Sequence, residues 1–203
     1  MCGSTGRLVP AALAFFLLAA TPAASQYLYI EPASFHVSPG ERTGVTFRAV
    51  GLPRLQAAWL RNATLLTDFA AFNVTGLHED GERVAGFASV RSTGTLVVYA
   101  SISREDCIWS AKALIVSAEP GAGFRRLAGL PLEIVPERDP YTLKAGEMLP
   151  VVVRLHGRPA PNVSLNAVST DADGRASVLV TGGKQTLEAK AGCLSSTLTF
   201  ELP

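Results

Sequence analysis

Hydrophobic and polar residues alternate along most of the chain with a period of two rather than the 3.6 of a helix. In residues 43–50, for example, Val45, Phe47 and Ala49 share one face of an extended segment. This alternation is typical of a half-buried β-strand. Further candidates, each bounded by Gly, Pro, Asn or Asp, are residues 27–31, 63–68, 72–75, 83–91 and 95–103. The short spacing between these segments predicts antiparallel sheets.

Residues 105–118 depart from this pattern. Ile108, Ala111, Lys112 and Ile115 recur at helical spacing, which predicts a turn or two of helix before a strand. The same residues also fit one long strand, and both alternatives stay open on the sequence alone.

A Gly-rich segment at residues 121–123 divides the chain, and the extended pattern restarts at residues 130–136. Later strand candidates are residues 147–155, 163–169, 175–180, 185–189 and 196–202. Short strands at this spacing are typical of a small immunoglobulin-like sandwich. We therefore predict a mostly β protein of two small antiparallel β-sandwich lobes. The first is an N-terminal β-rich domain over residues 26–124, and the second an immunoglobulin-like domain over residues 125–203.

The N-terminus has the layout of a cleaved signal peptide. Arg7 supplies a positive charge, residues 8–20 form an apolar run, and the small residues Ala23 and Ser25 precede Gln26. A run of this length is too short to cross a bilayer of about 30 Å. We expect residues 1–25 to be removed, leaving a periplasmic or secreted protein that does not span the membrane and begins at Gln26.

Composition narrows the range of partners and predicts one covalent link. Charged residues make up 17% of the chain and the formal net charge is +1, so the sequence has no electrostatic signature of nucleic-acid binding. Cys107 and Cys193 remain after cleavage. In an oxidising compartment we expect them to form one disulfide, with two buried free thiols as the alternative.

Catalytic motifs do not emerge from the sequence. It contains no Gly-x-Ser-x-Gly elbow, His-Glu-x-x-His helix or Walker loop. We therefore expect that the protein is not an enzyme. Glu137 and Asp139 lie in a Pro-bounded linker, which favours a solvated acidic turn over an acid/base pair. Asp171 and Asp173 precede Gly174, which favours a turn over a calcium loop.

The three histidines are scattered along the chain. His36, His78 and His156 form no i, i+2 or i, i+4 pair with another ligand. His36 and His156 are weak metal-ligand candidates, and a site would require them to converge with backbone oxygens in three dimensions.

Several strings resemble a bacterial periplasmic family whose members carry a domain of unknown function and are associated with nickel and cobalt uptake. They are GLPLEIVPERDPYTLKAGE at residues 129–147, HGRPA at 156–160, TDADGR at 170–175, YIEP at 29–32, VSPG at 37–40 and SAKAL at 110–114. The resemblance implies a periplasmic accessory protein of β-sandwich-like lobes that handles nickel or cobalt. Its implied partner is a membrane transporter component or another periplasmic protein.

One departure from that family bears on metal binding. Its members typically have a histidine directly after the signal peptide, where this chain has Gln26, and a later histidine that is not found in residues 188–196. Imidazole is the usual ligand for late first-row metals. We therefore expect a non-enzymatic binding or accessory module with no resident cofactor, and a structural or protein-interaction module with no metal role as the alternative.

Overall fold

The computed structural model describes residues 26–202. The predicted signal peptide lies outside these residues. The N-terminal half forms β1 (Tyr27–Pro32), β2 (His36–Val37), β3 (Arg42–Val50), β4 (Thr64–Leu66), β5 (Ala71–Asn73), β6 (Thr75–Asp80), β7 (Arg83–Ser89), β8 (Gly94–Arg104) and β9 (Cys107–Ser117). The C-terminal half forms β10 (Leu132–Pro136), β11 (Met148–Leu155), β12 (Arg158–Pro159), β13 (Ser164–Leu165), β14 (Val168–Ser169), β15 (Arg175–Leu179), β16 (Gly183–Ala191) and β17 (Leu194–Leu202). The 3-10 helices η1 (Ala57–Leu60), η2 (Ala122–Arg125) and η3 (Pro140–Thr142) lie between strands.

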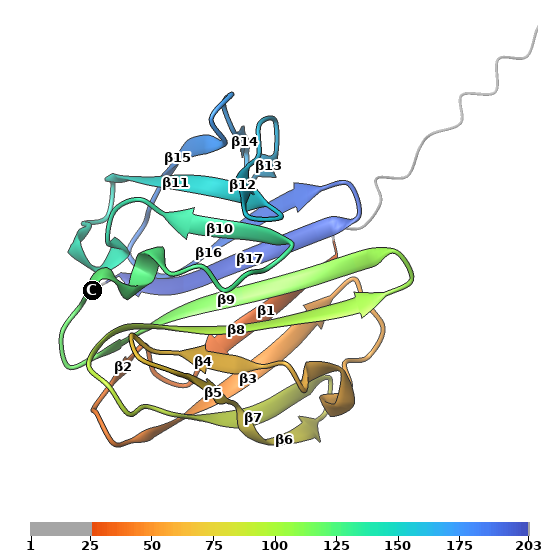
Figure 1. The fold of residues 1–203 in the computed structure, drawn as a ribbon, viewed down its shortest axis with the longest axis vertical. Helices are drawn as coiled ribbons and strands as arrows, with labels where there is room; N and C mark the ends of the chain where they lie inside the picture. The colour runs from red at the N-terminus through yellow and green to blue at the C-terminus, as the bar shows by residue number, and fades with distance from the viewer. Residues whose placement is uncertain (1–25, 203) are drawn as a thin grey trace, which may run out of the picture.

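The strands form three sheets. A nine-stranded central sheet has the order β14-β13-β16-β17-β9-β8-β4-β5, with β2 also paired to β9. The N-terminal sheet has the order β1-β3-β7-β6, and the C-terminal sheet joins β10, β11 and β12, with β15 also paired to β11. Figure 1 shows β8, β9 and β17 running between the two smaller sheets.

Strand β9 shows how the two smaller sheets cover opposite faces of the central one. Ala113 and Ile115 pack in a core with Phe47 of the N-terminal sheet, whereas Leu114 and Val116 pack in a second core with residues of the C-terminal sheet. Successive side chains of a strand point to opposite faces. Because both faces are buried, residues 113–116 form an unbroken apolar run instead of an alternating one.

Each lobe is therefore two sheets packed face to face, and the prediction of a mostly β, two-lobed sandwich protein is confirmed. The two sandwiches share the central sheet, whose strands come from both sides of residue 124. The division into domains at residues 124 and 125 stays a prediction.

The sheets are antiparallel as predicted, with two parallel strand pairs as exceptions. β17 runs parallel to β9, with Leu194 opposite Ile108 and Thr199 opposite Ala113, and β2 is also parallel to β9. Parallel neighbours need a long crossover connection. Here the crossover from β9 to β17 is residues 118–193, which include all of the C-terminal sheet.

Two local expectations are settled by the structure. Residues 105–118 contain the single strand β9 and no helix, so the alternative of one long strand is the correct one. The strand predicted over residues 163–169 is instead a tight hairpin of β13 and β14, because Asn166 has φ 48° and reverses the chain. Strand β6, which is exposed at nearly every position, was not predicted.

One buried ion pair joins the central sheet to the C-terminal sheet. Lys112 of β9 donates to Glu133 of β10 over 2.9 Å, and their side chains are 1% and 3% exposed. The same Glu133 oxygen accepts from the backbone N–H of Ala128 at 2.7 Å. Burial lowers the pKa of Lys112, and the charge of Glu133 partly offsets that shift.

Within residues 26–202, no helix has the length and apolar character needed to cross a membrane.

Candidate functional site

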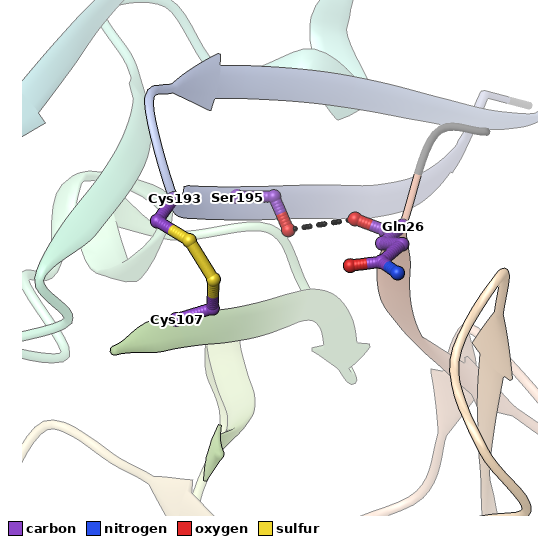
Figure 2. Close-up of a disulfide and its surroundings, with 4 residues drawn as sticks. All are labelled: Gln26, Cys107, Cys193 and Ser195. Carbon is purple, nitrogen blue, oxygen red and sulfur yellow. Dashed lines mark hydrogen bonds between the residues drawn. A yellow bond between two sulfur atoms is a disulfide. The ribbon is translucent and has the colours of Figure 1, made fainter. Parts of the chain in front are cut away.

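Gln26, the predicted first residue of the mature chain, lies at one end of the molecule beside the start of β17. The Ser195 hydroxyl donates to the Gln26 carbonyl oxygen at 3.0 Å, and Figure 2 shows this contact next to the disulfide. Two residues further along each strand, the Thr197 hydroxyl donates to the Leu28 carbonyl at 2.7 Å. Hydroxyls of β17 thus satisfy carbonyls on the edge of β1 that no neighbouring strand pairs.

Side chains of β1 extend this contact to β16. The Tyr29 hydroxyl donates to Glu188 at 2.6 Å, and Glu31 pairs with Lys184 at 3.1 Å. Burial, followed by the hydrogen bond to Glu188, raises the pKa of Tyr29 above its usual value. The N-terminal strand is therefore held to the last hairpin of the chain from Gln26 to Glu31.

A disulfide joins Cys107 to Cys193 at the same end of the molecule, with the two Cα atoms 4.7 Å apart. This separation lies within the range that an unstrained backbone allows, which ends near about 7 Å. The bond links the first residue of β9 to the turn before β17, where the Ile108 N–H also donates to the Cys193 carbonyl at 3.1 Å. The start of the parallel pair is thus fixed covalently.

Four hollows adjoin one another across this end, each sharing lining residues with the next, and we call them together the end groove. A hollow of about 600 Å³ and one of about 260 Å³ share Leu52 and Pro53. The hollow of about 260 Å³ also shares Gln26 and Trp109 with a small hollow of about 70 Å³. That small hollow shares Leu194 with a fourth hollow of about 520 Å³. The lining mixes apolar and polar residues, and Gln26 lies near its middle.

Charges of both signs lie along the end groove. Arg54 and Glu82 line one end, Arg104 and Glu105 lie near the middle, and Arg158 lines the other end. The shape suits an elongated ligand, and the mixed charges do not select a ligand of one sign.

The structure does not bring the candidate histidines together. His36 pairs with Val116 at the end of β9, whereas His156 lines a hollow with Leu194, which pairs with Ile108 at the start of β9. Eight residues of strand correspond to roughly 26 Å. His36 instead lies edge-on to the Tyr141 ring, with centroids 5.7 Å apart.

The other metal-ligand types are also dispersed. His156 has φ 49° in the turn after β11, and Nδ1 of His78 lies 2.9 Å from the Gly76 carbonyl. In residues 26–202, no three or more His, Cys, Asp or Glu side chains are grouped so that they could hold a metal ion. A metal site built from His36 and His156 is not supported by this arrangement.

The acidic residues singled out in the sequence have structural partners. Glu137 pairs with Arg175 at 3.2 Å, and Asp139 accepts from the Tyr141 N–H at 3.0 Å at the start of η3. Burial raises the pKa of Asp139, against the smaller effect of that hydrogen bond. Asp171 accepts from the N–H groups of Asp173 and Arg175 at 2.9 and 2.8 Å, as expected for a turn.

Sequence reasoning missed the contact between β1 and β17. Its signal was the run Ser195-Ser-Thr-Leu-Thr199, in which hydroxyl residues occupy positions that are buried in the structure. Ser195 and Thr197, on one face of the strand, have their partners in the carbonyls of Gln26 and Leu28, as a buried hydroxyl favours, whereas the buried hydroxyl of Ser196 on the other face has no partner among residues 26–202.

Comparisons with known proteins give a family but no described activity. The chain matches the family described as Domain of unknown function (DUF4198) over residues 23–189. No match was found among curated proteins.

Similar solved structures include the mouse nectin-like molecule 4 ectodomain, the Escherichia coli adhesin FdeC and an ICAM-5 ectodomain fragment. The first is 13% identical with a TM-score of 0.28, covering 89% of this chain and 66% of that one. FdeC is 16% identical with a TM-score of 0.34, covering 89% and 65%, and the ICAM-5 fragment is 14% identical with a TM-score of 0.31, covering 86% and 51%. This chain thus spans about half to two thirds of the length of those structures. Since the family match extends over well more than half of its residues, the chain belongs to the DUF4198 family.

Proposed function

We propose that this protein is an exported, non-enzymatic binding module, periplasmic or secreted, that presents the end groove to a segment of a partner protein. The observation that carries this proposal is the row of four adjoining hollows. Each shares lining residues with the next: first Leu52 and Pro53, then Gln26 and Trp109, then Leu194. A groove that crosses both lobes fits an extended segment better than a compact small molecule.

The attachment of β1 to β16 and β17 supports this proposal. The disulfide and the contacts of Gln26, Leu28 and Tyr29 hold both lobes at the groove. A surface held in one arrangement loses less conformational entropy when it binds a partner.

Crosslinking at two well-separated positions along the groove tests the proposal. A photoreactive amino acid is placed at Leu52 or Arg158, with Arg48 on the exposed side of β3 as the control position. We expect both groove positions, and not position 48, to capture one and the same exported or membrane protein. The Pro53→Trp variant fills the groove and should weaken binding of that purified partner by at least about tenfold. Equal capture from all three positions, or an unchanged affinity in Pro53→Trp, would contradict the proposal.

The resemblance to nickel- and cobalt-uptake proteins suggests a metal-handling role, and Gln26 argues against strong metal binding here. An N-terminal histidine would offer an amine and an imidazole within one residue, a chelate suited to square-planar nickel. An amide side chain is a poor ligand by comparison. The hollow beside Gln26 is lined by Trp109, Lys190 and Ser195 together with the disulfide, and none of these supplies an imidazole.

Calorimetric titration of the mature protein with nickel chloride should show no site tighter than roughly 1 μM, about −8 kcal/mol. The Gln26→His variant should bind nickel at least about tenfold more tightly, because the chelate is then complete. Tight nickel binding by the unmodified protein that is absent from the His36→Ala/His156→Ala variant would contradict this prediction and indicate a metal site at the two histidines.

A structural or protein-interaction module without a groove ligand is the second candidate. Phe69 is 91% exposed in the turn before β5, and β5 is an edge of the central sheet. A strand of a partner protein could pair with this unpaired edge and cover the exposed aromatic ring. In the crosslinking experiment, capture from position 69 in place of positions 52 and 158 would favour this candidate.

A further inference from the structure

A hollow of about 370 Å³ lies apart from the end groove and shares no lining residue with it. Its lining includes Val152 and Arg154 of β11, two residues apart and hence on one face of the strand. Val151 and Val153, on the opposite face, pack in the core against the central sheet. The hollow therefore lies on the outer face of the C-terminal sheet, and we call it the arginine hollow.

The floor of the arginine hollow is apolar. Val135 and Val152 are opposite each other in the β10–β11 register and are 7% and 8% exposed. Pro136 continues the floor, and Leu127, 47% exposed, lines the hollow beside it. The volume is within the range of small-molecule sites, roughly 300–1,000 Å³.

Two arginines line the arginine hollow without a carboxylate partner among residues 26–202. Arg154 donates through Nη1 to the Gly157 carbonyl at 2.8 Å, and Arg125 donates to the Glu137 carbonyl. Neither side chain forms an ion pair in the described part of the chain. Since a guanidinium has five N–H donors, both keep donors for a ligand.

Two acidic residues beside the hollow have other partners. Glu137 lines the hollow, but its side chain pairs with Arg175. Glu133, opposite Arg154 in the β10–β11 register, is engaged by Lys112. The hollow therefore combines an apolar floor with a net positive charge.

We propose that the arginine hollow binds a small organic carboxylate with a short hydrocarbon part. The carboxylate accepts hydrogen bonds from Arg125 and Arg154, whose planar groups match its two oxygens. The hydrocarbon lies on Val135 and Val152, where it removes apolar surface from water. An inorganic anion would use the arginines alone and leave this floor wet.

Calorimetric and ligand-detected NMR titrations of the mature, disulfide-bonded protein test this site with sodium hexanoate as the probe. We expect saturable binding of hexanoate, and binding weaker by at least about tenfold for the Arg125→Gln/Arg154→Gln variant. Arg48→Gln, which changes a partly exposed arginine that pairs with Glu31 on the N-terminal sheet, is the matched control and should bind like the unmodified protein. The exposed position of Leu127 provides a second variant that leaves the fold intact. Leu127→Ser should weaken hexanoate while leaving the weaker binding of acetate unchanged.

Four outcomes would overturn the proposal. The first is an unchanged hexanoate affinity in the double arginine variant, and the second is no saturable hexanoate binding up to about 10 mM, which corresponds to a binding free energy near −3 kcal/mol. The other two are hexanol or inorganic phosphate binding as tightly as hexanoate. Hexanol binding would indicate an apolar surface only, and phosphate binding a charged surface only.

Discussion

Replacing Glu133 by Gln is expected to destabilise the protein by about 3–5 kcal/mol, the cost of breaking a buried ion pair by removing one partner. The substitution preserves shape, but it leaves the Lys112 ammonium without a charge partner at 1% exposure. Urea unfolding at pH 7, followed by circular dichroism, measures the loss. A loss below about 1 kcal/mol, typical of an exposed pair, would contradict the assigned role.

The double variant Lys112→Met/Glu133→Leu is the control for packing. Two apolar side chains of similar size need no charge partner, so the double variant should be about as stable as the unmodified protein or more stable. The Ala128 N–H, which Glu133 also accepts from, would lose its partner and offset part of that gain. A double variant less stable than Glu133→Gln would show that the cost arises from packing and not from the unpaired charge.

The pH dependence separates a charge effect from a packing effect. The pKa of Lys112 in the folded protein is already below 10.5 because of burial, and losing Glu133 lowers it further. At pH values between the pKa of Lys112 in the folded protein and 10.5, Lys112 is protonated in the unfolded chain and neutral in the folded one. The free energy of unfolding therefore rises with pH in this window. The deficit of Glu133→Gln should therefore shrink from pH 7 towards pH 10, whereas a packing defect would be independent of pH.

Most strands could be predicted because their signal is local. Residues 43–50 alternate because one face of β3 is buried, and residues 83–91 and 95–103 lie close to β7 and β8. The helical spacing in β9 misled because a strand buried on both faces no longer alternates. Its apolar residues then occur at every spacing, including the helical one.

The pairing of the strands could not be predicted, since it depends on which distant segments meet. Nothing local in residues 194–202 indicates that β17 pairs with β9 in parallel, and the hydroxyl-rich run there does not identify β1 as the strand that it contacts. Lys112 likewise gives no local sign of being buried, because its partner Glu133 is 21 residues away. The end groove has the same origin, since Gln26 and Leu194 approach each other only in the folded chain.

Removing the disulfide is expected to lower the free energy of unfolding by about 4–5 kcal/mol in the chain-entropy model. The two cysteines are 86 residues apart, so the bond closes a long loop in the unfolded chain. The change is Cys107→Ser/Cys193→Ser, and urea unfolding of the oxidised protein beside the double variant measures it. Each single Ser variant should lose about as much as the double variant, because the bond and not the side chain carries the effect.

The same model predicts where the change acts. The backbone bond from Ile108 to Cys193 and the β9–β17 register do not depend on the sulfur atoms, so the folded double variant should keep its far-ultraviolet circular dichroism. Its unfolded chain is less compact, so its denaturant m-value should be larger. Because Cys193 is exposed, dithiothreitol should bring the unmodified protein to the stability of the double variant and leave the double variant unchanged. A loss below about 1 kcal/mol with an unchanged m-value would show that the contacts of β1 and β17 alone constrain this end of the molecule.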